Sequence, residues 1–222
     1  LIRGQGLLFF VFSRSCLRGF PPGLQKPLFL GIAPFGKSQY FCNRKQLSRI
    51  KKQQTSKEMK ATVVVYGSST GTCESIAQTI AEKLGVEAID AANLSADTIK
   101  THDNLLLGTS TWGAGELQDD WYDALKTIKA EGLEGKTVAV FGCGDCEAYC
   151  DTFCGGMKEL HDAAEAAGAR VIGSVDAAGY SYEDSEAVVD GRFVGLALDD
   201  VNEDDKTEQR IEAWLEEIKP SL

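Results

Sequence analysis

Residues 67–73 form a run of small and hydroxylated side chains, Gly-Ser-Ser-Thr-Gly-Thr-Cys, between an apolar segment and a helical pattern. Backbone N–H groups at the start of a helix attract anions, and hydroxyl groups beside them add hydrogen-bond donors. The run contains no Lys or Arg and lacks the Gly-Lys-Ser/Thr ending of nucleoside triphosphatases. This first loop predicts a phosphate site without triphosphate hydrolysis, with a simple helix cap as the alternative.

A second loop, residues 109–121, places Trp112 among small residues in the sequence Thr-Ser-Thr-Trp-Gly-Ala-Gly. A Trp at such a position after a strand has little of its own chain to pack against and suits a planar ligand. We therefore expect Trp112 to contact a planar ligand. The other Trp of this loop, Trp121, is expected to be a buried structural residue.

A third loop, residues 142–151, begins a stretch in which four cysteines fall within twelve residues: Cys143, Cys146, Cys150 and Cys154. Their spacing, C-x2-C-x3-C-x3-C, differs from the C-x2-C-x2-C-x3-C-P run that binds iron–sulfur clusters in bacteria. Cys143 ends an apolar segment, and Cys154 is expected in the following helix, where a free Cys behaves as a small apolar residue. We predict no metal site here.

Each loop follows an apolar segment, namely residues 61–66, 105–107 and 137–141. These segments do not alternate apolar with polar residues, as expected for parallel strands covered on both faces. Residues 74–84 and 211–218 place apolar side chains three and four positions apart, which predicts amphipathic helices. The pattern predicts an α/β fold, a doubly wound parallel sheet with helices on both faces. Ligands bind such sheets beyond the carboxyl ends of the strands, where all three loops are expected to lie.

Charge is divided unevenly along the 222 residues. Residues 1–58 contain eleven Lys and Arg and a single acid, Glu58, whereas residues 59–222 contain 12 basic and 32 acidic residues, a net charge of −20. Nucleic acid is an unsuitable partner for so acidic a domain, since its phosphates attract Lys and Arg. The acidity favours partner proteins with basic surfaces.

The segment 1–58 is expected to lie outside the folded domain. Its apolar run, residues 7–12, is far shorter than the roughly 20 residues that span a bilayer, so we predict no membrane span. The first Met is Met59, and the first strand pattern begins directly after it. We predict that residues 1–58 are a disordered or mistranslated extension, with a targeting peptide as the alternative, and that residues 59–222 form one domain.

Taken together, the three loops resemble those of flavodoxins. The motifs that carry the resemblance are the hydroxyls around Thr70-Gly71, the sequence Thr-Trp-Gly-x-Gly-Glu-Leu-Gln from Thr111, and Gly-x-Gly-Asp ending at Asp145 with Tyr149 four residues on. They follow one another in order within residues 59–222. The resemblance implies a flavodoxin-like three-layer fold with a five-stranded parallel sheet in the order 2-1-3-4-5. The segment 179–199 resembles the insertion that divides the fifth strand of long-chain flavodoxins.

The resemblance further implies a non-covalently bound FMN cofactor. The first loop would bind the phosphate, Trp112 and Tyr149 would flank the isoalloxazine ring, and the backbone around Gly144 would meet its pyrimidine edge. The family usually has Thr at the position of Cys73, which provides a weaker donor. The implied FMN-binding residues are Ser68, Ser69, Thr70, Gly71, Thr72, Cys73, Thr111, Trp112, Gly113, Ala114, Gly115, Cys143, Gly144, Asp145, Tyr149 and Cys150.

The function implied is that of a low-potential one-electron carrier, not an enzyme, that uses the semiquinone/hydroquinone couple of FMN. The carbonyl of Gly113 would accept a hydrogen bond from the N–H of the reduced ring, because glycine lets the Gly113–Ala114 peptide turn over easily. The implied partners are flavodoxin reductase and other oxidoreductases, met transiently by a cytoplasmic monomer.

Two other functions share this kind of sheet. An FMN-dependent NAD(P)H:quinone reductase would need a substrate pocket over the flavin, and the sequence offers no evident catalytic acid or base, since His102 and His161 are expected at surface and helix positions. A flavin-free receiver domain would need an acidic pair after the first strand, where this chain has Tyr66-Gly67-Ser68. Binding of FMN and turnover with NAD(P)H distinguish these alternatives.

Overall fold

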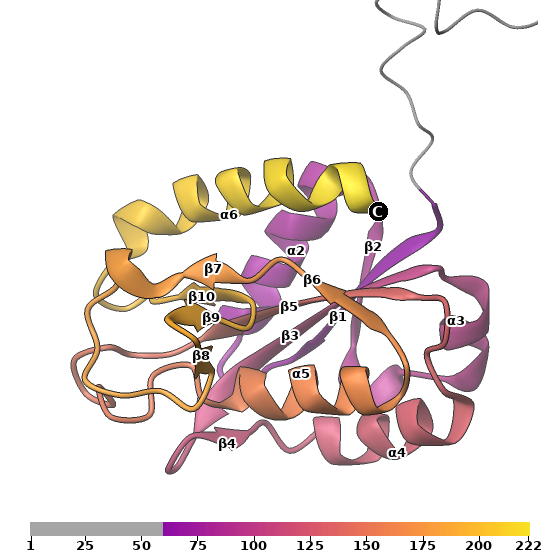
Figure 1. Cartoon of the computed structure of the whole chain (residues 1–222), viewed down its shortest axis with the longest axis horizontal. Helices are drawn as coiled ribbons and strands as arrows, with labels where there is room; N and C mark the ends of the chain where they lie inside the picture. The colour runs from indigo at the N-terminus through magenta and orange to yellow at the C-terminus, as the bar shows by residue number, and fades with distance from the viewer. Residues whose placement is uncertain (1–59) are drawn as a thin grey trace, which may run out of the picture. The chain divides into compact units, whose positions relative to one another are not determined.

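The computed structural model describes residues 60–222, and the prediction for residues 1–58 lies outside this range. The parallel strands of its central sheet are β1 (Thr62–Gly67), β2 (Glu87–Asp90), β3 (Asn104–Trp112), β5 (Thr137–Cys143), β6 (Arg170–Ile172) and β10 (Leu196–Leu198). They lie in the order β2-β1-β3-β5, with β6 and β10 both pairing along the far side of β5 (Figure 1). Because β6 and β10 share one position, the predicted order 2-1-3-4-5 is confirmed.

Helices cover both faces of the sheet, as predicted. The α-helices are α2 (Thr72–Leu84), α3 (Ala96–Thr101), α4 (Trp121–Glu131), α5 (Gly156–Ala166) and α6 (Asp204–Ile218), and the short 3-10 helices are η2 (Ala91–Asn93), η3 (Ala177–Gly179) and η4 (Lys219–Ser221). Figure 1 shows α2 and α6 on one face and α4 and α5 on the other, with α3 beside α4. This is the expected three-layer arrangement.

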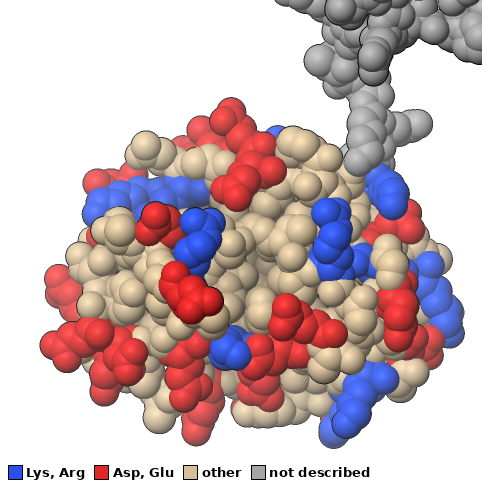
Figure 2. Space-filling view, viewed as in Figure 1, with Lys and Arg blue, Asp and Glu red and all other residues tan. Residues whose placement is uncertain are grey.

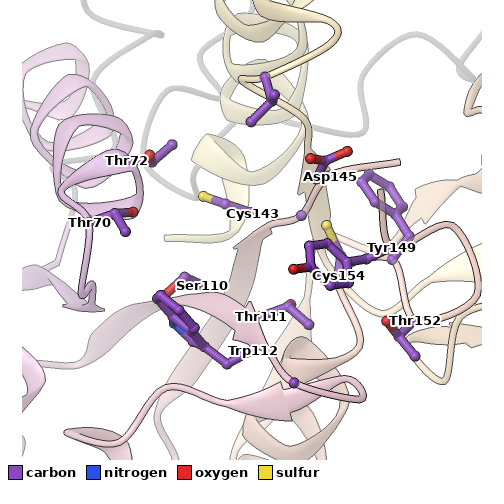
Figure 3. A pocket seen from close by; sticks show the side chains of 14 residues that line it. Thr70, Thr72, Ser110, Thr111, Trp112, Cys143, Asp145, Tyr149, Thr152 and Cys154 are labelled. Atoms are coloured by element: carbon purple, nitrogen blue, oxygen red, sulfur yellow. The ribbon is translucent and has the colours of Figure 1, made fainter. Parts of the chain in front are cut away.

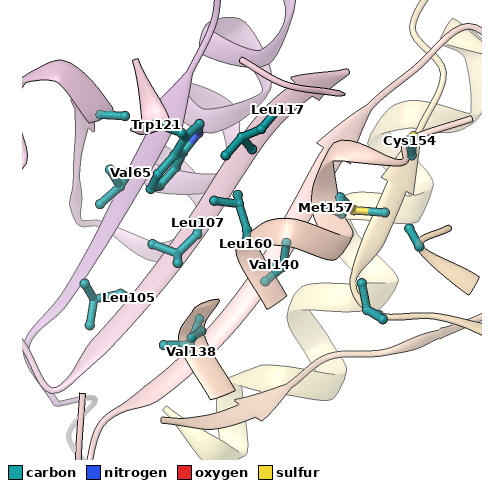
Figure 4. Packing of buried hydrophobic residues seen from close by; sticks show 14 of the residues in the cluster. Val65, Leu105, Leu107, Leu117, Trp121, Val138, Val140, Cys154, Met157 and Leu160 are labelled. Carbon is teal, nitrogen blue, oxygen red and sulfur yellow. The ribbon is translucent and has the colours of Figure 1, made fainter. Parts of the chain in front are cut away.

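The strands are buried on both faces because their apolar residues do not alternate with polar ones. Val64 packs into the core beneath α2 and α6, whereas Val63 and Val65 pack into the core against α4 and α5. In the core against α4 and α5, Leu107 of β3 faces Leu160 of α5 (Figure 4). Parallel pairing of β1 with β3 and of β3 with β5 brings the carboxyl ends of these strands together at one edge.

Trp121 is the buried structural Trp that the sequence predicts. Its side chain is fully buried, and its Nε1–H donates to the carbonyl oxygen of Gly108 at 3.0 Å. A Cβ at Gly67 would lie 2.5 Å from the indole ring, so glycine at the end of β1 gives the ring its room. Trp121 thereby fixes the second loop against the first.

Residues 173–195 interrupt the fifth strand position between β6 and β10. They contain β7 (Val175–Asp176), β8 (Val188–Val189) and β9 (Arg192–Phe193), which pair antiparallel in the order β7-β9-β8. The divided strand is confirmed, but the predicted bounds, 179–199, were wrong at both ends. The chain rejoins the sheet at Leu196 because Gly195 allows a very close approach; a Cβ there would lie 2.1 Å from the carbonyl oxygen of Val140.

Candidate functional site

A pocket opens at the carboxyl ends of β1, β3 and β5, where the three loops meet (Figure 3). Its volume is about 220 Å³, below the roughly 300–1,000 Å³ of sites that enclose a drug-sized ligand. A larger ligand would therefore keep one edge exposed. The lining residues are Thr70, Thr72, Ser110, Thr111, Trp112, Gly113, Cys143, Gly144, Asp145, Tyr149, Thr152, Phe153, Cys154 and Val201.

The first loop forms the N-terminus of α2. Gly71 is the N-cap residue with φ of 92°, a left-handed conformation that glycine adopts readily, and no side chain caps the helix. The Gly71 N–H donates to Ser68 Oγ at 3.1 Å, which tightens the loop. Thr70 and Thr72 line the pocket at this end. Uncapped N–H groups and two hydroxyls make a site for an anion.

Two other residues of the first loop have side chains engaged elsewhere. Ser69 Oγ accepts a hydrogen bond from Gln118 Nε2 at 3.3 Å, which joins the first and second loops. Cys73 is fully buried in the core beneath α2. Its hydrogen bond with the Cys143 thiol, together with burial, raises the pKa of Cys73 well above the ordinary value, so the thiol stays neutral. Only the backbone of Cys73 is left for a ligand.

The second loop makes a tight turn between β3 and the short strand β4 (Glu116–Leu117). The Gly115 N–H donates to the Trp112 carbonyl at 3.0 Å, and Gly113 has φ of 51°. Trp112 Nε1–H donates to Ser110 Oγ at 3.0 Å, which holds the indole at the pocket rim. Ala114 lies in the turn without lining the pocket.

The third loop is a turn capped by its own carboxylate. Asp145 Oδ1 accepts from the N–H groups of Glu147 at 3.1 Å and Ala148 at 2.8 Å, and the Asp145 carbonyl accepts from the Tyr149 N–H at 3.0 Å. The hydrogen bond from Ala148, with help from Asn202, lowers the pKa of Asp145. Tyr149 therefore projects from a turn that starts at an ionised carboxylate.

Two aromatic side chains stand on different sides of the pocket, as Figure 3 shows for Trp112 and Tyr149. They are 42% and 57% exposed, which is unusual for large rings that could pack in a core. Between them the Thr111 Oγ1 is buried and has no hydrogen-bond partner among the described residues. A buried hydroxyl without a partner is unfavourable unless a ligand pairs with it. These features fit a flat, polar-edged ligand.

The cysteines of the third loop contribute to packing. Among the residues that the structure describes, five cysteines are free. Cys154 lies in the turn before α5, with φ of 54°, and not in the helix, so that prediction was wrong. The turn brings its thiol within 3.7 Å of the carbonyl oxygens of Gly142 and Leu198. Cys150 contributes its carbonyl, which accepts from Glu183 N–H at 2.8 Å.

A cluster of ligand-type side chains on α5 lies apart from the pocket lining. His161, Asp162 and Glu165 bring their ligand atoms within 4.8 Å of one another. Asp162 already forms an ion pair with Lys158, and both carboxylates are exposed. His161 lies in α5, the helix position expected for it, whereas His102 is the C-cap residue of α3 and is half-buried.

The sequence prediction and the pocket overlap in part. Predicted residues that line the pocket are Thr70, Thr72, Thr111, Trp112, Gly113, Cys143, Gly144, Asp145 and Tyr149. Lining residues that the prediction missed are Ser110, Thr152, Phe153, Cys154 and Val201. Val201 follows β10, and the rule that ligands gather beyond parallel strands could have pointed to it.

Comparison with known proteins identifies the family. The family model described as Flavodoxin matches residues 64–214. The chain belongs to the flavodoxin family. It is 43% identical to flavodoxin 1 of Azotobacter vinelandii over 159 residues, which cover 68% of the chain and 91% of that relative. It is 40% identical to the flavodoxin of Synechocystis sp. over 164 residues, 71% of the chain and 95% of the relative.

Solved structures agree with this membership. A crystal structure of Fusobacterium nucleatum flavodoxin bound to flavin mononucleotide matches with a TM-score of 0.69 and 32% identity, covering 74% of the chain and 99% of that structure. The named relatives are electron-transfer proteins and not enzymes. Family membership excludes the receiver alternative and does not favour the reductase.

Proposed function

We propose that the chain carries single low-potential electrons on FMN held non-covalently in the pocket. The observation that carries this proposal is the pair of exposed aromatic rings, Trp112 and Tyr149, on different sides of a pocket that begins at the uncapped N-terminus of α2. Family membership and the FMN-bound relative support the cofactor. FMN, when bound, supplies a ring that takes up two electrons in separate steps.

The phosphate group is assigned to the first loop. The first-turn N–H groups of α2 and the hydroxyls of Thr70 and Thr72 donate to it, and the helix dipole adds attraction. The residues that line the pocket include no Lys or Arg. The phosphate is therefore bound by neutral donors, which keeps positive charge away from the ring.

The ring is assigned to the space between Trp112 and Tyr149, with Thr111 Oγ1 hydrogen-bonded to a polar atom of the ligand. The Gly144 N–H already donates to the Leu198 carbonyl at 3.0 Å. We therefore assign the polar contacts with the pyrimidine edge of the ring to the backbone of Asp145 and the carbonyl of Gly144. Stacking between two aromatic faces orients a planar ring without charged groups.

Gly113 is assigned the proton contact of the reduced ring. Its φ of 51° shows that this position already uses the conformational freedom of glycine. A Cβ at Gly113 would lie 2.2 Å from a carboxylate oxygen of Glu116, so a side chain here would displace Glu116. The small residue would let the Gly113–Ala114 peptide turn its carbonyl toward the ring and accept a hydrogen bond from a ring N–H.

The charge around the pocket supports the proposal of a low second potential. Asp145 is the carboxylate of the lining, and its lowered pKa keeps it ionised. Two unit charges a few Å apart interact by roughly 4 kcal/mol at an effective dielectric of 20. Adding negative charge to a ring beside Asp145, with no Lys or Arg among the lining residues, is therefore unfavourable.

Redox partners are proposed to meet the exposed rim of the pocket. Trp112, Tyr149 and Val201 are exposed there, the last by 67%. Figure 2 shows Asp and Glu over much of one face, with Lys and Arg among them. An acidic surface with a small apolar rim suits transient binding of a flavodoxin reductase or another oxidoreductase with a basic surface. The opposite charges speed association, and the small apolar contact lets the partner dissociate quickly.

A cytoplasmic monomer is the proposed form. The free cysteines of the described residues are typical of a reducing compartment. Within residues 60–222, no helix combines the length and apolar character needed to cross a membrane.

Titration of the apoprotein with FMN tests the proposal. We expect flavin fluorescence to be quenched at one FMN per chain, since stacking on Trp112 and Tyr149 brings the ring against aromatic faces. The same holoprotein is then mixed with NADH or NADPH and a quinone. Absence of FMN binding would refute the carrier and the reductase together, and steady turnover without a second protein would favour the reductase.

A further inference from the structure

Asp199 is a fully buried carboxylate placed directly behind the rim of the pocket. Its Oδ2 accepts from the Cys146 N–H and from Asn202 Nδ2, both at 2.8 Å. Its Oδ1 accepts from the N–H groups of Val201 and Asn202, both at 2.9 Å. Four N–H groups therefore satisfy a buried charge that would otherwise be strongly unfavourable.

Asn202 extends this network to the third loop. Its Nδ2 donates to Asp145 Oδ1 at 2.9 Å as well as to Asp199 Oδ2. Asp145 Oδ1 is the atom that caps the turn leading to Tyr149. An unbroken set of hydrogen bonds thus connects buried Asp199 to the turn that carries an exposed aromatic ring.

The network joins two parts of the pocket wall that are far apart in sequence. Asp145 follows β5 and Val201 follows β10, and both line the pocket. Pairing of Leu198 with Cys143 brings these two strand ends side by side. Figure 3 shows Asp145 close to Tyr149 at one end of the pocket. Strand pairing fixes the distance between the two loops, and the side-chain network fixes their conformation.

We propose that Asp199 and Asn202 are positioning residues that hold the turn from Asp145 to Tyr149 in its FMN-binding form before the cofactor arrives. The inference rests on the proposed function. FMN then binds a turn that is already ordered, which avoids the loss of affinity that follows when only a fraction of molecules is competent. The same network keeps the Asp145 carboxylate beside the ring, which lowers the second one-electron potential.

The protonation state of Asp199 agrees with this role. Burial alone would raise its pKa, but hydrogen bonds from the Cys146 thiol, Asn202 and the backbone lower the pKa to about 2. The carboxylate is therefore charged at neutral pH and attracts all four N–H groups. Asn202 separates it from the second carboxylate, Asp145, whose charge would otherwise repel it.

The test compares Asn202→Ala with Asp200→Asn in the full chain. Asn202→Ala removes both amide hydrogen bonds and changes no charge. Asp200 is the neighbouring exposed acid, and its carboxylate accepts from Thr207 Oγ1 at 3.0 Å and lies outside the network. Asp200→Asn thus changes the charge near the pocket and leaves the positioning intact.

We expect Asn202→Ala to weaken FMN binding about tenfold, chiefly through slower association, because a smaller fraction of molecules then holds the competent turn. The variant loses the hydrogen bond to Asp199 and the one to Asp145. Its second one-electron potential should move toward that of free FMN. Amide hydrogen exchange of the apoprotein should become faster at residues 145–149 in Asn202→Ala alone. Asp200→Asn should bind FMN within about twofold of the unaltered chain.

Three results would overturn the inference. They are unaltered exchange at residues 145–149 in Asn202→Ala, FMN binding and potential equal to those of the unaltered chain, or the same loss of affinity in Asp200→Asn. Failure of the unaltered chain to bind FMN is a separate result that removes the proposed function itself.

Discussion

The thiols of Cys73, at the start of α2, and Cys143, at the end of β5, interact in the buried core between the helix and the sheet. Cys73 is fully buried and Cys143 is 6% exposed. The Cys73 side chain therefore serves packing between α2 and the sheet. The hydroxyls proposed to donate to the phosphate are those of Thr70 and Thr72, which line the pocket on either side of Gly71.

Replacing Cys73 should lower the stability of the apoprotein without changing its affinity for FMN. Cys73→Ala removes a buried thiol and should lower the free energy of unfolding by about 1 kcal/mol. The FMN dissociation constant should change by less than about twofold, since the backbone N–H is kept. Urea unfolding of the apoprotein and a flavin fluorescence titration measure the two effects. A tenfold loss of affinity would mean that the side chain does contact the phosphate.

Removing either aromatic ring should weaken FMN binding. Trp112→Ala and Tyr149→Ala each remove one stacking face, which is expected to lower affinity by about tenfold or more and to raise the second potential. Tyr122→Ala is the matched control, because Tyr122 is 45% exposed on α4 and does not line the pocket. Equal affinities in all three variants would contradict the stacking assignment.

Thr111→Val should have opposite effects on stability and binding. The Thr111 Oγ1 is buried without a partner among the described residues, so its replacement by a methyl group should leave the apoprotein as stable or more stable by about 1 kcal/mol. FMN affinity should fall about fivefold, because the ligand loses one hydrogen bond. Thermal unfolding of the apoprotein measures the change in stability, and FMN titration measures the change in affinity. A destabilised apoprotein with unchanged FMN affinity would show that the hydroxyl serves the fold.

Low pH should lower the free energy of unfolding of the apoprotein, because Asp199 becomes protonated. The folded-state pKa of Asp199 is lowered to about 2 from 3.8, so its charged form favours the folded state. Its contribution, about 2 kcal/mol, is fully present above pH 4 and is lost as pH falls from 4 through 2. Urea unfolding between pH 2 and 5 should show this loss in the unaltered chain and in Asp200→Asn. Asp199→Asn should be less stable at pH 5 and less dependent on pH below 4; parallel pH curves would count against the assignment.

The sheet and the three loops could be predicted because they depend on local pattern. Residues 137–141 form a continuous apolar run that appears as β5, and the helical face of residues 74–84 appears as the buried side of α2. Trp112 was predicted from its small neighbours, which leave the ring exposed at a strand end. In each case the residues that decide the structure are adjacent in the sequence.

The features that could not be predicted depend on pairing between distant segments. The position of Val201 at the pocket and the bonds of Asp199 to the third loop follow from β10 lying beside β5, more than fifty residues away. Cys154 adopts φ of 54° in a turn because its thiol contacts Leu198 of β10. Only the folded arrangement shows that these residues meet.

Anaerobic spectroelectrochemical titration of the FMN-loaded chain tests the central claim most directly. The account predicts two separate one-electron steps, the second at a much lower potential than in free FMN. The reason is that Asp145 repels added negative charge and the lining contains no Lys or Arg to offset it. A single two-electron step near the potential of free FMN would contradict the carrier function and favour a reductase.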